Sequence, residues 1–180
     1  MSKIVISIIV VMLSTFCYGQ DGSNSFAKNI KENAYLQLSS SSAFHHDSQQ
    51  PITTALEIGY KVLPKTYGFI RGGSTINIYD GLNGQSDYCT RSNEGGLGIY
   101  YDLIRAKGDL RGFLLGSAGP HVYAGTTFGS TDWKYTMYEC GFSFSFERHS
   151  TIVATFGYRY YNAREAKNFK GPYVSLGFRL

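Results

Sequence analysis

Serine, histidine and acidic residues are the side chains of this 180-residue sequence that could carry nucleophilic catalysis. Such a site needs a serine and a histidine within hydrogen-bonding reach, with an acid that orients the imidazole. The four histidines are His45 and His46 in a polar stretch, His121 near the end of an expected strand, and His149 beside Ser150 in an expected short turn. Since none holds a regular position on the apolar face of a strand, we expect no catalytic residues and no enzyme.

Metal and phosphate binding have weak signals. His45-His46-Asp47 has suitable residue types for a metal, but adjacent histidines on a loop are more commonly solvated, and a set of four ligands is not evident. The glycine pairs Gly72-Gly73 and Gly95-Gly96 lack the strand-to-helix context of a phosphate-binding loop and are typical of bends or close strand contacts. We therefore expect no metal and no cofactor.

Charged side chains also recur at alternate positions of otherwise apolar segments. Buried charges are tolerable only when they are paired and hydrogen-bonded. If the apolar faces of these segments point outward, the charges point into the interior of a closed sheet, where we expect a structural ionic network. Its expected members are Glu57, Lys61, Arg71, Asp102, Glu139, Arg159 and Arg179, while Arg111 stays open because its strand has an ambiguous phase.

Length and composition restrict the elements that could position these residues. The mass of 20.0 kDa fits one domain. Aromatic residues reach 16%, glycines number 21, and charged residues are 17% against roughly 25% in average soluble domains. This composition is not that of a disordered or fibrous chain, and it favours strands over coiled coils and helical bundles. The net charge of +4 comes without a basic cluster, which argues against a nucleic-acid partner.

The N-terminus is typical of a secretory signal peptide. Lys3 precedes an apolar run from Ile4 to Leu13, and small residues follow at Cys17 and Gly19. The alternative, a membrane-spanning anchor, needs roughly 20 apolar residues. We expect residues 1–19 to be the signal peptide, 20–32 a short N-terminal segment, and 33–180 the folded domain.

After removal of the signal peptide, two cysteines remain. Cys89 falls in an expected polar loop and Cys140 on the apolar face of an expected strand, so we do not expect them to form a disulfide.

Strict alternation of apolar and polar residues dominates the chain after residue 33. Between 134 and 147, Tyr138, Phe142 and Phe146 share one face and Glu139 and Ser143 share the other, which predicts a strand with one apolar face. Eight such segments occur, at about 34–39, 54–62, 67–79, 94–104, 110–127, 134–147, 151–161 and the last residues to 180.

The links between these segments alternate in length. Long links are expected at 40–51, 80–93, 120–133 and 162–172, and short ones at 63–66, 105–109 and 147–151. Aromatic residues fall near both strand ends, with Tyr60, Tyr101, Phe144, Phe146 and Phe178 at the short-turn rim and Tyr138, Tyr158 and Tyr160 at the long-loop rim. Both features are typical of a transmembrane barrel. The alternative is a soluble β-sandwich whose apolar faces point inward.

On these residues the chain resembles the small eight-stranded outer-membrane barrels of the OmpX and OmpA-transmembrane-domain type, a porin-like family. The most specific parts are Thr155 to Tyr161 and the terminal Gly171 to Leu180. The resemblance implies an all-β, eight-stranded antiparallel up-and-down transmembrane barrel, and a last strand that the barrel-assembly machinery recognises. Family members usually end in Phe, whereas this chain ends in Leu180 with Phe178 before it.

The resulting expectation is an integral protein of the outer membrane of a Gram-negative bacterium. An eight-stranded barrel has an interior that side chains can fill, so we expect a plugged lumen and a structural or surface-interaction role, in adhesion or envelope integrity, through four extracellular loops. Expected partners are outer-membrane lipid and lipopolysaccharide, the barrel-assembly machinery and an extracellular surface ligand. The open alternatives are a narrow pore for small solutes, a lipid-A-modifying barrel enzyme and a secreted soluble ligand-binding barrel.

Overall fold

The structure is a computed structural model that describes residues 33–44, 49–79, 88–104, 109–110, 113–147, 151–163 and 168–180. The chain divides into a unit Met1–Tyr35 and a unit Leu36–Leu180. The expected signal peptide 1–19 and segment 20–32 lie outside the described residues.

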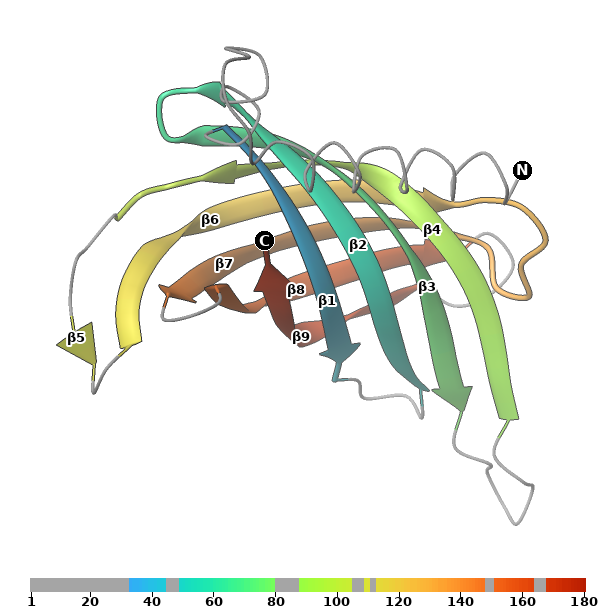
Figure 1. The fold of residues 1–180 in the computed structure, drawn as a ribbon. Helices are drawn as coiled ribbons and strands as arrows, with labels where there is room; N and C mark the ends of the chain where they lie inside the picture. Colours follow the sequence, from blue (N-terminus) through green and yellow to red (C-terminus); the bar gives the residue numbers. More distant parts are fainter. Residues whose placement is uncertain are drawn as a thin grey trace. The chain divides into compact units, whose positions relative to one another are not determined.

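The described residues contain nine strands that form one antiparallel sheet (Figure 1). Apart from β5, each strand pairs with the next one in the chain, so that β4 pairs with β6, and β1 also pairs with β9. Strands β1–β4 and β6–β9 therefore form a closed eight-stranded up-and-down barrel, as predicted. The short β5 pairs only with the start of β6. The strands are β1 (Ala34–Ala43), β2 (Gln49–Leu63), β3 (Thr66–Tyr79), β4 (Tyr88–Tyr101), β5 (Asp109–Leu110), β6 (Phe113–Thr127), β7 (Tyr135–Glu147), β8 (Thr151–Ala163) and β9 (Phe169–Arg179).

Several strands extend beyond their expected ends at the side of the long links. β1 continues through Ser39–Ser42, which pair with Gly177–Val174 of β9, and β2 begins at Gln49. The apolar alternation stops before the backbone ladder does, because ladder hydrogen bonds do not depend on side-chain polarity. Cys89 was expected in a polar loop, but it lies in β4 opposite Ile78. Cys89 and Cys140 are both free and exposed.

The link lengths differ from the expectation at one place. At the end of the barrel where long links were expected, the segments between strands are 44–48, 80–87, 128–134 and 164–168. At the other end, the turns at 64–65 and 148–150 are short. The expected short turn at 105–109 is wrong, because β4 ends at Tyr101 and β6 begins only at Phe113. The connection instead contains β5 and a bridge from Ile104 to Ala118, so part of it pairs with the first half of β6.

The two faces of the barrel wall differ sharply in polarity. Apolar side chains on the outer face are largely exposed, at 64% for Ile70, 65% for Leu97 and 66% for Leu176. Charged side chains on the inner face are buried, with only 4% of Glu139 and 2% of Arg159 exposed. The barrel therefore has a polar interior and an apolar exterior. Within the described residues, no helix is long and apolar enough to cross a membrane.

The phase of β6, which the sequence left ambiguous, is now defined. His121 and Tyr123 are buried inside the barrel, and Val122 between them is 54% exposed. The pairing of β6 with β7 shifts register between Leu115 and Ser117. Such a bulge changes the phase of a strand at that point, which explains why the alternation could not be followed through residues 113–117.

The strands that close the barrel approach each other at two glycines. Gly96 of β4 pairs with Gly125 of β6, and a Cβ added to Gly96 would overlap the Ala124 carbonyl oxygen and the Gly125 Cα. Both obstacles are backbone atoms, which cannot move without separating the two strands. Gly96 is therefore required by the closure itself.

We predict that Gly96→Ala lowers the free energy of unfolding by about 1–3 kcal/mol, the usual cost of overpacking. Urea unfolding of the refolded protein measures it. The control is Gly68→Ala, since a Cβ at Gly68 would meet only Val62 Cγ1 at an ordinary 3.6 Å. Equal stability of the two variants would show that β4 and β6 do not close the barrel as described.

Candidate functional site

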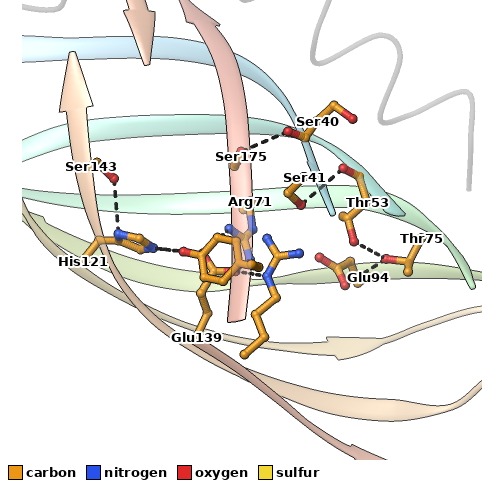
Figure 2. A network of polar contacts seen from close by, with 12 residues as sticks. Ser40, Ser41, Thr53, Arg71, Thr75, Glu94, His121, Glu139, Ser143 and Ser175 are labelled. Carbon is orange, nitrogen blue, oxygen red and sulfur yellow. Dashed lines mark hydrogen bonds and ion pairs between the residues drawn. The ribbon is translucent and has the colours of Figure 1, made fainter. Parts of the chain in front are cut away.

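The carboxylate of Glu139, which points inward from β7, is the centre of an ion-pair network in the lumen. Arg71 of β3 donates to it through both terminal nitrogens, Nη1 to Oε1 at 2.9 Å and Nη2 to Oε2 at 3.0 Å. Arg159, which pairs with Glu139 across β7 and β8, donates Nε to Oε2 at 2.6 Å. All three side chains are nearly inaccessible to solvent. Figure 2 shows Arg71 and Glu139 within the network of polar contacts. Two charge-assisted contacts, one of them bidentate, thus hold one buried anion.

His121 connects this anion to the hydroxyl groups of Tyr173 and Ser143. Its Nε2 lies 2.9 Å from Glu139 Oε1 and 2.8 Å from the Tyr173 hydroxyl, and its Nδ1 lies 3.2 Å from Ser143 Oγ. Serine, histidine and glutamate in series are also the residue types of a hydrolase triad. Here Ser143 is only 8% exposed and also contacts Thr155 Oγ1 at 2.9 Å. Since Glu139 already binds two guanidinium groups, the arrangement is that of an ion-pair network.

Aromatic rings cover the guanidinium planes of this network. Arg71 Cζ lies 3.5 Å from the ring centroid of Tyr123, and Arg159 Cζ lies 4.1 Å from that of Tyr173. Tyr123 in turn stacks on Phe69 at 6.1 Å between centroids. A desolvated guanidinium gains about 2 kcal/mol from such a contact. The rings therefore stabilise the faces of the arginines, while Glu139 accepts hydrogen bonds from Arg71 Nη1 and Nη2 and from Arg159 Nε.

A second acid, Glu94 of β4, lies nearer the long-loop end of the lumen. Its Oε2 accepts a 2.6 Å hydrogen bond from the Tyr135 hydroxyl and a 3.3 Å bond from Thr75, and Thr75 contacts Thr53 at 2.8 Å. Glu94 is fully buried. This cluster links β2, β3, β4 and β7 across the barrel.

The segment 128–134 brings an aromatic side chain to this end of the lumen. Trp133 is 6% exposed and lies 4.4 Å from Tyr135 and 5.2 Å from Tyr161, measured between ring centroids. The Trp133 carbonyl accepts a 2.5 Å hydrogen bond from Ser92, and the Asp132 amide donates to the Arg91 carbonyl at 2.9 Å. The segment is thus hydrogen-bonded to β4, and its indole ring packs against Tyr135 of the Glu94 cluster.

A third polar group lies near the short-turn end. Arg179 donates Nε and Nη2 to Gln37 Oε1 at 3.1 and 2.9 Å, joining β9 to β1. The Tyr100 hydroxyl donates to Ser117 Oγ at 3.1 Å, and Ser117 contacts Ser145 at 2.9 Å. Polar contacts therefore occur at three levels along the lumen.

The structure places the sequence-predicted residues on the inner face to different degrees. It joins Arg71, Glu139 and Arg159 directly and buries Glu57, which is paired with Arg71 in register across β2 and β3. Asp102 is buried where its amide donates to the Lys65 carbonyl at 2.7 Å. Lys61 and Arg179 are half-buried. Arg111 lies outside the described residues.

Four central residues were missed by the sequence reasoning. His121 was missed because the phase of β6 was ambiguous, and Tyr135 and Tyr173 because aromatic residues were assigned mainly to the outer face. Glu94 could have been predicted as an inward residue, because it is in phase with inward Gly96 and Gly98. It was left out because it is the first residue of its expected strand.

Metal ligation has no candidate in the part of the chain that the structure describes, where no three His, Cys, Asp or Glu side chains gather. His45, His46, Asp47 and His149 lie outside the described residues.

Comparisons with known proteins add little. No protein-family model matches the chain, and no curated protein matches it. One solved structure that it resembles is the N-terminal β-barrel domain of Pseudomonas aeruginosa OprF, with 14% sequence identity and a TM-score of 0.39, covering 81% of this chain and 97% of that domain. At this identity and TM-score, the likeness adds nothing to what the barrel itself shows.

We predict that Glu139→Gln lowers the free energy of unfolding by about 3–5 kcal/mol, because it leaves two buried guanidinium groups without a counter-charge. Urea unfolding of the folded barrel measures the loss. The matched control is Lys134→Gln, which neutralises an exposed residue just before β7 and is expected to change stability by less than about 0.5 kcal/mol. A similar small effect for both variants would mean that Glu139 does not hold the arginines.

Proposed function

We propose that the chain is an integral outer-membrane β-barrel with a plugged lumen, whose role is structural or interactive and is carried by its long-side loops. The observation that carries this proposal is the reversed polarity of the wall. Buried Arg71 and Glu139 face the axis, while Leu97 and Leu176 are about two-thirds exposed on the outside. A soluble barrel or sandwich requires the opposite arrangement.

The exposed apolar side chains occur on every strand of the ring. Isolated apolar residues are normal on a soluble surface, but a continuous band indicates a partner that is itself apolar. In lipid, a closed barrel also satisfies every backbone donor and acceptor within the wall. The band includes Leu38, Tyr60, Ile70, Leu97, Val122, Tyr138, Phe156 and Leu176.

The proposed orientation follows from the two barrel ends. Three connections lie at the same end as the start of β1 and the end of β9. Two of them, 64–65 and 148–150, are short turns, and the third is the longer connection between β4 and β6 that contains β5. Outer-membrane barrels have short periplasmic turns and longer extracellular loops. We therefore assign this end to the periplasm and the links 44–48, 80–87, 128–134 and 164–168 to the cell exterior.

The last strand supports insertion by the barrel-assembly machinery of a Gram-negative bacterium. Phe178 and Leu180 of this end are 60% and 78% exposed, and Leu180 exchanges backbone hydrogen bonds with Leu36 of β1. β9 thus presents the alternating apolar face expected of an assembly signal and also closes the ring against β1.

The lumen contents favour a plug over a pore. Arg71 and Arg159 both bind Glu139 inside the barrel, and the Trp133 ring packs against Tyr135 of the Glu94 cluster. An eight-stranded barrel leaves an interior that side chains can fill. The loops are then the part of the chain through which it contacts other surface molecules.

The experiment on location compares two arginine substitutions at equally exposed leucines. Leu97 lies in the apolar band, between outward Tyr101 and exposed Arg91, whereas Leu63, 63% exposed, lies at the end of β2 beside a turn. In phospholipid vesicles we predict that Leu97→Arg costs about 2–4 kcal/mol of folding free energy and Leu63→Arg about 0–1 kcal/mol, because the cost depends on depth in the bilayer. Both are measured by urea unfolding monitored by heat-modifiable gel migration.

Equal effects of the two substitutions, or recovery of the wild-type protein in the soluble fraction without detergent, would contradict a membrane location.

The plug is tested separately in planar bilayers. We predict that the purified protein gives no stable unitary conductance, because the ion pairs at Glu139 close the lumen. The barrel's insertion is verified in the same preparation by protease protection. Stable unitary conductance of the wild-type protein would establish the narrow-pore alternative instead.

A further inference from the structure

Three outward side chains form a row across neighbouring strands at the long-loop end. We propose that Tyr138, Tyr160 and Lys170 bind a phosphate-bearing sugar headgroup of the outer leaflet, the lipid A part of lipopolysaccharide. Tyr138 of β7 pairs with Tyr160 of β8, which pairs with Lys170 of β9. The inference rests on the proposed membrane location and orientation and names one lipid that the barrel would hold.

The row is built on the rigid wall. Tyr138 is 51% exposed, Lys170 is exposed, and the rings of Tyr138 and Tyr160 stack with centroids 6.4 Å apart and an angle of 21° between planes. The preceding and following residues, such as Glu139 and Arg159, point inward. The three side chains therefore lie in one row on the outer surface, with Tyr160 partly exposed between Tyr138 and Lys170.

The row lies at the level along the barrel where a lipid headgroup is expected. Toward the short turns, the next outward rows are Cys140, Tyr158 and Pro172 and then Phe142, Phe156 and Val174. Toward the loops, the next row contains polar Thr136 and Asn162. Tyrosines favour the interface between hydrocarbon and headgroups. The change from apolar to polar thus falls at this row, where the first charged group of a lipid would lie.

Charge complementarity selects an anionic lipid. Lys170 and Lys134 are exposed at this end of β7–β9, and no outward carboxylate occurs among the described residues of that surface, 134–140, 158–163 and 168–172. On β4 the corresponding cation, Arg91, has Asp132 beside it, whose carboxylate accepts the Arg91 backbone amide at 3.2 Å. A lysine ammonium binds phosphate as a point charge, and tyrosine hydroxyls donate to its oxygens.

The test measures the heat-unfolding midpoint of the full barrel in detergent micelles with added bis-phosphorylated lipid A. Ligand that binds only the folded state raises the midpoint, and titration gives the dissociation constant. We predict that Lys170→Gln weakens lipid A binding about fivefold, the usual contribution of one basic residue near an anionic headgroup. Lys170→Arg, which keeps the charge, restores most of the binding.

The matched control is Lys65→Gln, which removes the same charge from an exposed residue in a turn at the opposite rim and is expected to bind like wild type. Dephosphorylated lipid A and the phospholipid phosphatidylglycerol are the other arms, and weaker midpoint shifts with both are predicted.

Equal lipid A binding by Lys170→Gln and wild type, or equal shifts with dephosphorylated lipid A or with phosphatidylglycerol, would overturn this inference. A barrel that fractionates with membranes but shows no such discrimination loses only the lipid site. A chain that is soluble without detergent loses the proposed function as well.

Discussion

The charge pairing at Glu139 is the interaction on which the rest of the barrel depends. Two guanidinium groups from β3 and β8 and an imidazole from β6 meet this one carboxylate on β7. Each would be costly to bury alone. Arg71 lies on β3 and Glu139 on β7, and these strands are separated in the ring by β4 and β6. Their contact therefore also links two separate parts of the barrel wall. The rings of Tyr123 and Tyr173 lie against the guanidinium groups of Arg71 and Arg159.

Charge balance extends this principle along the whole lumen. Glu139 compensates one of its two arginines, and Glu94 supplies the second negative charge nearer the loops. Among the other inward side chains that the structure describes, the charges of Lys61 and Arg179 balance those of Glu57 and Asp102. The apolar side chains lie on the outer wall, as the proposed location in a bilayer requires.

The architecture could be predicted from the sequence because a strand's period of two is a local property. The alternation of polar and apolar residues, as with inward Glu139 and outward Phe142, defines both faces of β7 without knowledge of its neighbours. Partner choice is not local, so the meeting of Arg71 with Glu139, far apart in the chain, could not be derived. The bulge between Leu115 and Ser117 hid the phase of β6 and with it His121. Strand ends rich in serine and threonine, as in β1, carried too little apolar signal to be seen.

Fluorescence quenching by brominated lipid acyl chains tests most directly whether the outer wall contacts lipid. Trp133 is the single tryptophan of the chain and lies inside the barrel, so Trp133→Phe combined with Phe156→Trp moves the only probe to an outer position that is 54% exposed. We predict strong quenching of this variant by lipids brominated along the acyl chain and little quenching by aqueous acrylamide. Quenching by acrylamide, with none by the brominated chains, would show that the apolar wall faces water.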